Sequence, residues 1–286
     1  MFPFRRILFP VDYSDACNRV VPYVQEAVGH FSADVTLVHA YGPTAVAYLE
    51  PPIGGPGLAS QIQTYEEKRL ADFARESFGS AATCVVELGE PGGVIHSLVR
   101  NRGTDVVMMP TEGSGPLRRM LLGSVTTKVL HDVSAAVWTA TAKALAARAA
   151  GPYQSIVCAL ELGPGEESKA VIVAASALAK SYGAKLLLTH VIDTPRTTFD
   201  IDFAPYLKDL KDAADSQMRQ LKSDLGVNAP HQIFDGNVAD GVRRAAEDVS
   251  ADLIVVGRGQ AQGAITRIWS NLYSVVREAP CPVLSI

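Results

Sequence analysis

Residues 104–126 read TDVVMMPTEGSGPLRRMLLGSVT, and the interpretation of the whole chain rests on this stretch. The run VVMM at 106–109 is typical of a buried strand, and a loop rich in small residues separates it from Gly123-Ser124. A glycine loop lets the backbone approach a ligand closely, and the first turn of a helix carries N–H groups without partners in the helix. The stretch therefore predicts a strand, a loop and a helix start that can bind an anion such as a phosphate.

The same order of segments occurs twice in the chain. Four pairs of segments correspond: 6–12 with 155–161, 33–40 with 184–191, 104–109 with 251–256, and 136–139 with 282–285. Two copies of about 140 residues fit the usual size of a domain and are too long for a solenoid repeat. We therefore predict a first domain at 1–141, a connector at 142–152, which is rich in alanine and expected to be short and helical, and a second domain at 153–286.

Short β-branched runs alternate with longer helical patterns in each copy. Helices are expected at 14–30, 58–78 and 92–102 in the first copy, and at 165–182, 204–225 and 238–249 in the second. Nearly continuous apolar strands separated by helices indicate a parallel sheet covered on both faces. Because crossovers in such sheets are right-handed, each copy should form a doubly wound α/β domain.

Ligands in doubly wound folds bind outside the carboxyl ends of the strands, at the place where the strand order reverses. Asp12, Ala40 and the loop that begins at Pro110 all follow predicted strands. We expect them to meet at one crevice.

The composition excludes several classes of protein. The 286 residues are 48% hydrophobic and 20% charged, as in a soluble globular protein, and the formal net charge of −4 gives no reason to expect nucleic-acid binding. No apolar stretch reaches the roughly 18–20 residues that a membrane span requires. The charged N-terminus precedes only a short apolar run that Asp12 interrupts, which favours a first core strand over a secretory signal. Four scattered cysteines without a CxxC pair indicate neither a zinc site nor a disulfide framework, so a cytoplasmic location is expected.

Three groups of residues resemble the universal stress protein family: LFPVDYS at 8–14, LVHA at 37–40, and the glycine loop that ends at Gly123-Ser124. The resemblance covers nearly the whole chain, and two copies in series are similar to a tandem member of that family. It implies a five-stranded parallel sheet in each copy, of the Rossmann-like, adenine-nucleotide α-hydrolase-like type. It also implies ATP binding where the motif Gly-x2-Gly-x9-Gly-Ser/Thr follows the fourth strand.

The first copy departs from that motif at one place, since Pro110 stands where the first glycine is expected. Proline has no N–H and fixes φ near −65°, so it either weakens nucleotide binding or preorganises a tight turn. In the second copy Gly257 is kept, but Gln260 and Ser270-Asn271 replace the rest of the motif. We therefore predict one nucleotide site, in the first copy, and a mainly structural second copy.

The resemblance implies the following nucleotide-binding residues: Pro10, Val11, Asp12, Ala40, Met109, Pro110, Gly113, Ser114, Gly115, Gly123, Ser124, Val125 and Thr126. Pro10, Val11 and Ala40 would line an adenine slot, while N–H groups and hydroxyls of 124–126 would meet the phosphates. Asp12 would bind the adenosine end, although an acid stabilised by a helix dipole is the alternative. Ser124 could equally be an ordinary cap.

ATP is the expected cofactor. Glu112 would repel its phosphates unless a magnesium ion bridges them, but no protein ligands for a metal are predicted. His39 and His190 recur at equivalent strand positions, where a hydrogen-bonded histidine is expected rather than a metal ligand.

No nucleophile paired with a base and no Walker lysine is evident, so we predict no catalytic residues and at most slow ATP hydrolysis. The Gly/Pro-rich insertion at 41–60 could act as a nucleotide lid or as a flap that binds a partner protein.

The leading functional hypothesis is a cytoplasmic stress-response protein that is regulated by adenine-nucleotide binding. A nucleotide-free interaction scaffold is the alternative, and a nucleotide-dependent enzyme is a third. The family resemblance also implies pairing through the fifth strands, here between Val137-Trp138 and Val283-Leu284 within one chain, with a further homodimer as an open question. For these four residues plain core packing is the alternative.

Overall fold

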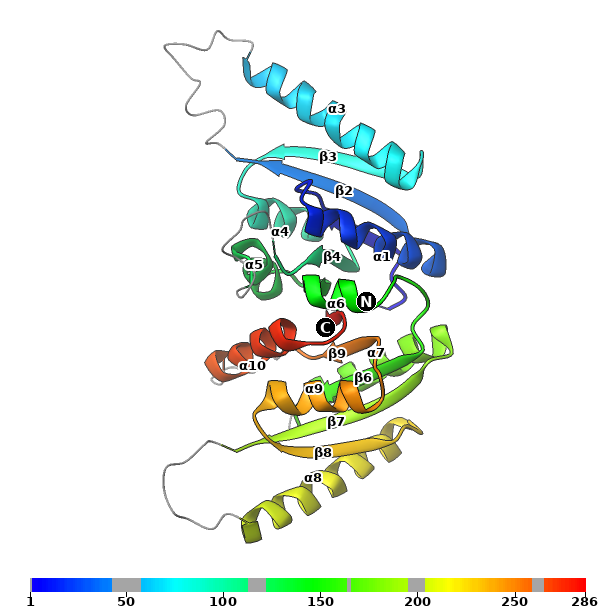
Figure 1. Ribbon diagram of the computed structural model, residues 1–286, viewed down its shortest axis with the longest axis vertical. Coiled ribbons are helices and arrows are strands. Elements are labelled where there is room, and N and C mark those ends of the chain that lie inside the picture. The colour runs from blue at the N-terminus through cyan, green and yellow to red at the C-terminus, as the bar shows by residue number, and fades with distance from the viewer. Residues whose placement is uncertain (1, 43–57, 113–121, 164–165, 195–203, 259–264) are drawn as a thin grey trace. The chain divides into compact units, whose positions relative to one another are not determined.

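The computed structural model describes residues 2–42, 58–112, 122–163, 166–194, 204–258 and 265–286. The chain divides into two compact units, Met1–Trp138 and Thr139–Ile286 (Figure 1). The residues of the insertion at 43–57 and of the glycine loop at 113–121 lie outside the described residues. Among the described residues, no helix has both the length and the apolar character to cross a membrane.

The first unit contains a parallel sheet and its crossover helices. Its elements are β1 (Arg6–Pro10), α1 (Asp15–Phe31), β2 (Asp34–Tyr41), α3 (Leu58–Phe78), β3 (Ala82–Leu88), α4 (Pro91–Arg102), β4 (Val106–Pro110), α5 (Ser124–Asp132) and β5 (Ala136–Ala140). The strand order is β3-β2-β1-β4-β5. β1 pairs in parallel with β2 on one side, where Pro10 lies opposite Val38, and with β4 on the other, where Leu8 lies opposite Val107. The chain therefore reverses its winding between β1 and β4.

The second unit repeats this arrangement. Its elements are α6 (Ala142–Ala147), β6 (Ser155–Leu160), α7 (Glu167–Tyr182), β7 (Lys185–Asp193), α8 (Ala204–Leu225), β8 (His231–Gly236), α9 (Val238–Asp248), β9 (Leu253–Val256), α10 (Ile265–Glu278) and β10 (Val283–Ser285). The strand order β8-β7-β6-β9-β10 is equivalent to that of the first unit. The predicted fold class, two similar doubly wound α/β domains, is confirmed.

Several helix boundaries differ slightly from the predicted ones because caps lie outside the helices. Ser14 is the N-cap of α1, since its backbone is extended and its side chain accepts a hydrogen bond from the Cys17 N–H. Glu90 caps α4 in the same way, so this helix begins at Pro91 rather than at residue 92. The expected helix start at Ser124 is confirmed. Part of the predicted connector forms α6, which Thr141 caps.

In each sheet, an aspartate carboxylate accepts backbone N–H hydrogen bonds at the amino-terminal ends of the strands. Asp105 Oδ2 accepts hydrogen bonds of 2.9 Å from the N–H groups of both Arg5 and Arg6, which lie just before and at the start of β1. In the second unit, Asp252 accepts from the N–H groups of Gln154 at 2.8 Å and Ser155 at 3.2 Å. The aspartates that recur in segments 104–109 and 251–256 therefore have a structural role. They satisfy backbone donors that the sheet leaves without partners.

Candidate functional site

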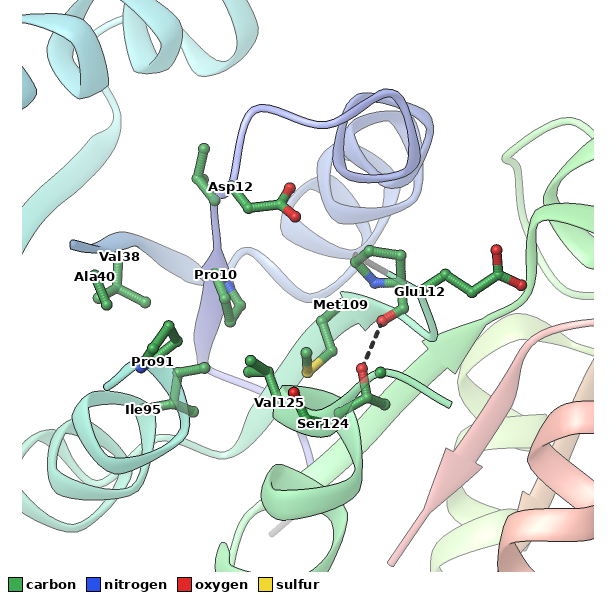
Figure 2. A pocket seen from close by; sticks show the side chains of 14 residues that line it. Pro10, Asp12, Val38, Ala40, Pro91, Ile95, Met109, Glu112, Ser124 and Val125 are labelled. Atoms are coloured by element: carbon green, nitrogen blue, oxygen red, sulfur yellow. Dashed lines mark hydrogen bonds between the residues drawn. The ribbon is translucent and has the colours of Figure 1, made fainter. Parts of the chain in front are cut away.

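A pocket lies at the carboxyl ends of β1, β2 and β4, as expected for this fold (Figure 2). It contains about 670 Å³ of empty space, part of which is open to solvent. Its lining residues are Pro10, Val11, Asp12, Val38, Ala40, Pro91, Ile95, Met109, Pro110, Glu112, Gly123, Ser124, Val125 and Thr126. The pocket therefore contains residues from β1, β2, β4, α4 and α5.

One part of the pocket is an apolar slot. Val38 and Ala40 of β2 face it together with Pro91 and Ile95 of α4, as Figure 2 shows. The Val11 N–H donates a 2.8 Å hydrogen bond to the Val38 carbonyl, so the pairing with β2 continues one residue past the end of β1. Walls of this kind, with few polar groups, suit a flat and largely apolar group such as an aromatic ring.

The other part of the pocket is the N-terminus of α5. Its N-cap is Gly123, which has no side chain to cap the helix, and no side-chain cap is present among the described residues. By contrast, side chains cap the N-termini of four other helices: Ser14 for α1, Glu90 for α4, Thr141 for α6 and Asn237 for α9. The first N–H groups of a helix lack partners within it and carry a partial positive charge. The pocket thus offers several backbone donors that can bind an anionic group.

Two hydrogen bonds hold the start of α5 against the end of β4. The Gly123 N–H donates to the Thr111 carbonyl at 2.8 Å, and the Thr126 hydroxyl donates to the Pro110 carbonyl at 3.1 Å. Thr126 is 2% exposed. Its hydroxyl thus has a partner within the protein and helps to position the start of α5. Pro110 ends β4 in extended backbone, a conformation that proline allows, and contributes its carbonyl.

Asp12 lies where β1 leads into α1. Its Oδ1 accepts hydrogen bonds from the Ser14 N–H at 3.0 Å and from the Ser14 hydroxyl at 2.6 Å. Both bonds are made by Oδ1, so among the described residues the second carboxylate oxygen has no hydrogen-bond partner that competes with a ligand in the pocket that Asp12 lines. Tyr13 turns the chain here with a φ of 59°, in the left-handed region that non-glycine residues seldom adopt.

A cluster on α3 supports this turn. The Arg69 guanidinium lies 3.8 Å from the centre of the Tyr13 ring, and the His39 ring lies 4.8 Å from it on β2. Glu66 Oε2 is 3.5 Å from His39 Nε2 and 3.8 Å from Arg69 Nη1. Burial, reinforced by the Glu66 charge, raises the pKa of Tyr13, so this phenol stays neutral in the physiological range. The turn that carries Asp12 is thus fixed by packing as well as by hydrogen bonds.

The structure brings together every predicted site residue that it describes. Pro10, Val11, Asp12, Ala40, Met109, Pro110, Gly123, Ser124, Val125 and Thr126 all line the pocket. Gly113, Ser114 and Gly115 lie outside the described residues, as do Arg118 and Arg119. The sequence reasoning missed Val38, Pro91 and Ile95. For Pro91 and Ile95 a signal existed, because the helix after the third strand also begins at the carboxyl edge of the sheet. The binding roles of all these residues stay predictions.

The two recurring histidines are hydrogen-bonded strand residues, as expected. His39 Nδ1 lies 2.7 Å from the Val11 carbonyl, and His190 Nδ1 lies 2.9 Å from the Leu160 carbonyl. Burial lowers the pKa of His190, which favours its neutral form. Within the described parts of the chain, no cluster of three or more His, Cys, Asp or Glu side chains is arranged to hold a metal ion.

The second unit carries a larger side chain at the position equivalent to Ala40. Val191 stands there, and its methyl groups lie against Gly241 of α9. A Cβ atom added to Gly241 of α9 would be 2.6 Å from Val191 Cγ2, far inside van der Waals contact. At the end of β9, Arg258 is 9% exposed, and burial lowers its pKa to about 10. Gln260 lies outside the described residues. Val191 therefore packs directly on α9, at the position where the first unit has the smaller Ala40.

Comparison with known proteins finds similarity over both halves of the chain. The model of the universal stress protein family matches residues 3–140 and, a second time, residues 152–286. Universal stress protein A homolog 1 of Coxiella burnetii is 29% identical over 140 residues, which cover 47% of this chain and 96% of that protein. A universal stress protein of Thermus aquaticus is 31% identical over 124 residues, covering 42% and 90%. The crystal structure of a universal stress protein from Archaeoglobus fulgidus has a TM-score of 0.67 at 19% identity, covering 98% of this chain and 95% of its own. This last likeness concerns the fold alone.

Proposed function

The chain belongs to the universal stress protein family, and from this premise we propose that its first unit binds ATP or a related adenine nucleotide in the pocket at the ends of β1, β2 and β4. In this proposal nucleotide occupancy regulates a cytoplasmic stress response, because a ligand that binds one conformation more tightly shifts the population toward it. Hydrolysis is slow at most, since the described pocket residues contain no histidine or lysine placed to assist phosphoryl transfer.

The observation that carries the proposal is that one pocket combines an apolar slot with a helix N-terminus that offers N–H donors. The apolar slot between Ala40 and Ile95 suits an adenine ring, and the uncapped N-terminus of α5 suits phosphate groups. Asp12 has a carboxylate oxygen available for the ribose hydroxyls. A nucleotide has these three chemical parts in this order, so the residues present fit ATP.

Magnesium belongs to the proposal because of the charges in the pocket. Its described lining contains two carboxylates, Asp12 and Glu112, and no lysine or arginine. The phosphates would be neutralised by the N–H groups of α5 and by a bound magnesium ion, which would also reduce repulsion from the carboxylates. In Figure 2 the Glu112 carboxylate points away from the other lining residues, which reduces that repulsion further.

ATP with magnesium should stabilise the protein against heat. At about ten times the dissociation constant, a ligand that binds only the folded first unit adds about 1.4 kcal/mol to its free energy of unfolding. Thermal melts with ATP and magnesium should show this upward shift. Inorganic triphosphate with magnesium is the control, because it lacks the adenosine that fills the slot. An unchanged melting temperature at millimolar ATP would favour a nucleotide-free interaction scaffold instead.

Calorimetric titration should yield one ATP site per chain. The reason is that Val191, which packs against Gly241 in the second unit, is larger than Ala40 of the first and is expected to obstruct an adenine ring there. A fitted stoichiometry of two equivalent sites would contradict the assignment of a structural role to the second unit. Replacing Ala40 with valine, the residue that the second unit carries there, should weaken ATP binding about tenfold by the same steric effect.

A further inference from the structure

An ion pair joins α4 to α5 beside the pocket. Glu90, the N-cap of α4, accepts the Gly92 N–H on Oε1 at 3.0 Å and the Gly93 N–H on Oε2 at 2.9 Å. The same Oε2 receives a hydrogen bond of 2.8 Å from Lys128 Nζ, on α5. Because backbone donors already hold the carboxylate in place, less freedom is lost when Lys128 binds it than for an ordinary surface pair.

The close approach of the two helices depends on a glycine. A Cβ atom at position 92 would lie 2.7 Å from Lys128 Cδ and 3.1 Å from its Cγ. The aliphatic stem of Lys128 therefore crosses the start of α4 where Gly92 has no side chain. The Lys128 hydrogen bond lowers the pKa of Glu90, and the Glu90 hydrogen bond raises that of Lys128. Both groups are consequently charged throughout the neutral pH range.

A second contact joins the same helices further along. His96 Nδ1 of α4 lies 2.8 Å from the carbonyl of Asp132, the last residue of α5. One contact joins the start of α4 to the middle of α5, and the other joins the middle of α4 to the end of α5, so the two together restrain the separation of the helices. This separation matters for the pocket, because α4 supplies Pro91 and Ile95 while α5 supplies Ser124, Val125 and Thr126.

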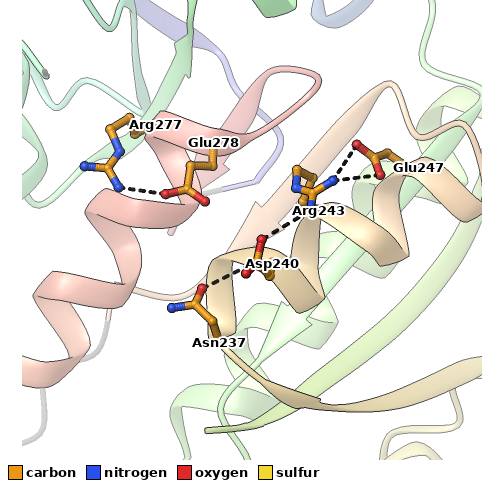
Figure 3. Close-up of polar contacts among 6 residues, drawn as sticks. All are labelled: Asn237, Asp240, Arg243, Glu247, Arg277 and Glu278. Carbon is orange, nitrogen blue, oxygen red and sulfur yellow. Dashed lines mark hydrogen bonds and ion pairs between the residues drawn. The ribbon is translucent and has the colours of Figure 1, made fainter. Parts of the chain in front are cut away.

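The second unit lacks this link among its described contacts. Asn237 stands in the place of Glu90 and caps α9 by accepting the Asp240 N–H. Ser274 stands in the place of Lys128, and its short side chain carries no charge. The polar contacts drawn in Figure 3 stay within each helix or its cap: Arg243 binds Asp240 and Glu247 along α9, and Arg277 binds Glu278 on α10. Among the described contacts, an ion pair between these two helices is thus found in the first unit, beside the pocket, and not in the second.

We propose that Glu90 and Lys128 are positioning residues for the nucleotide site, which hold α4 at the distance from α5 that lets the pocket close on an adenosine group. The inference rests on the proposed function and names residues that do not line the pocket. The ion pair acts through Pro91 and Ile95, so it affects every ligand that enters the apolar slot, whether or not that ligand carries phosphates.

The test compares Lys128→Met with the wild-type chain. Methionine keeps an unbranched stem over Gly92 but removes the charge. We expect the dissociation constants of both adenosine and ATP with magnesium to rise by the same factor, about two- to fivefold, as measured by calorimetry. Lys128→Arg, which can still reach Glu90, should stay within about twofold of the wild type. The matched control is Lys169→Met, which removes a surface ion pair of similar length, Lys169 with Glu166 at 2.9 Å, at the start of α7 in the second unit.

The outcomes separate this inference from the function on which it rests. Unchanged affinities in Lys128→Met would overturn the positioning role while leaving nucleotide binding intact. A loss confined to ATP would also overturn it, because the ammonium group would then contact phosphates directly. If the wild-type chain binds neither adenosine nor ATP, the proposed function is wrong, and the positioning role, which rests on it, is wrong as well. A melting temperature of Lys128→Met close to the control's would exclude unfolding as the cause of weaker binding.

Discussion

Replacing Gly123 with valine should abolish ATP binding while the protein stays folded. Gly123 is buried, lines the pocket and precedes the uncapped helix α5. Its φ of −61° and ψ of 147° lie in the extended region that valine readily adopts, so the backbone does not resist the change. The isopropyl group instead occupies the space beside the first N–H groups of α5, where the phosphates are proposed to bind.

The expected loss of affinity is large because the valine side chain would prevent several charge-assisted hydrogen bonds at once, namely those proposed between the phosphates and the first N–H groups of α5. Such bonds contribute about 1.5–3 kcal/mol each, so the dissociation constant of ATP should rise at least about 100-fold. Gly123→Ala should show a smaller rise, since a methyl group fills less of the space. Gly151→Val is the matched control, because a Cβ atom there meets nothing within 4 Å. Undiminished binding by Gly123→Val, measured by calorimetry on protein with a normal melting curve, would place the phosphates elsewhere.

Replacing Asp252 with alanine should destabilise the second unit strongly. Asp252 is 6% exposed and accepts hydrogen bonds from the N–H groups of Gln154 and Ser155, while Arg148 Nη2 lies 3.5 Å from its Oδ2. Alanine leaves two backbone donors without their acceptor at the start of β6. At about 1–3 kcal/mol for each buried group left unsatisfied, the free energy of unfolding should fall by about 3 kcal/mol.

Urea unfolding followed by circular dichroism measures this change. Asp209→Ala is the control, because Asp209 is exposed on α8 and its replacement should change stability by less than about 0.5 kcal/mol. Asp105→Ala should reproduce the effect in the first unit, where Asp105 accepts the N–H groups of Arg5 and Arg6. A loss for Asp252→Ala no larger than the control's would show that water or neighbouring groups replace the carboxylate.

The candidate site was predictable where it depends on the ends of parallel strands. Asp12, Ala40 and Pro110 lie at the carboxyl ends of three strands of one sheet. Parallel strands bring these ends to one edge, so the three residues had to lie near one another. The helix start at Ser124 was predictable for a similar reason, since a Gly-Ser pair before an amphipathic segment is a local signal. The position of α4 after the third strand placed its start at the same edge, but which of its side chains, here Pro91 and Ile95, face the pocket depends on how α4 packs against β2 and α5.

By itself the sequence determined the two copies, their alternating strands and helices, and the residues at the carboxyl edge of each sheet. These features follow from periodicities of about two and 3.6 residues and from repeated segments, all of which are local in the chain. Only the tertiary structure decided that Val191 packs against Gly241, that the Thr126 hydroxyl binds the Pro110 carbonyl, and that Lys128 reaches Glu90 across Gly92. Each of these contacts joins a side chain to an atom of another secondary-structure element, and the close packing of the elements, which no local pattern encodes, determines whether they meet.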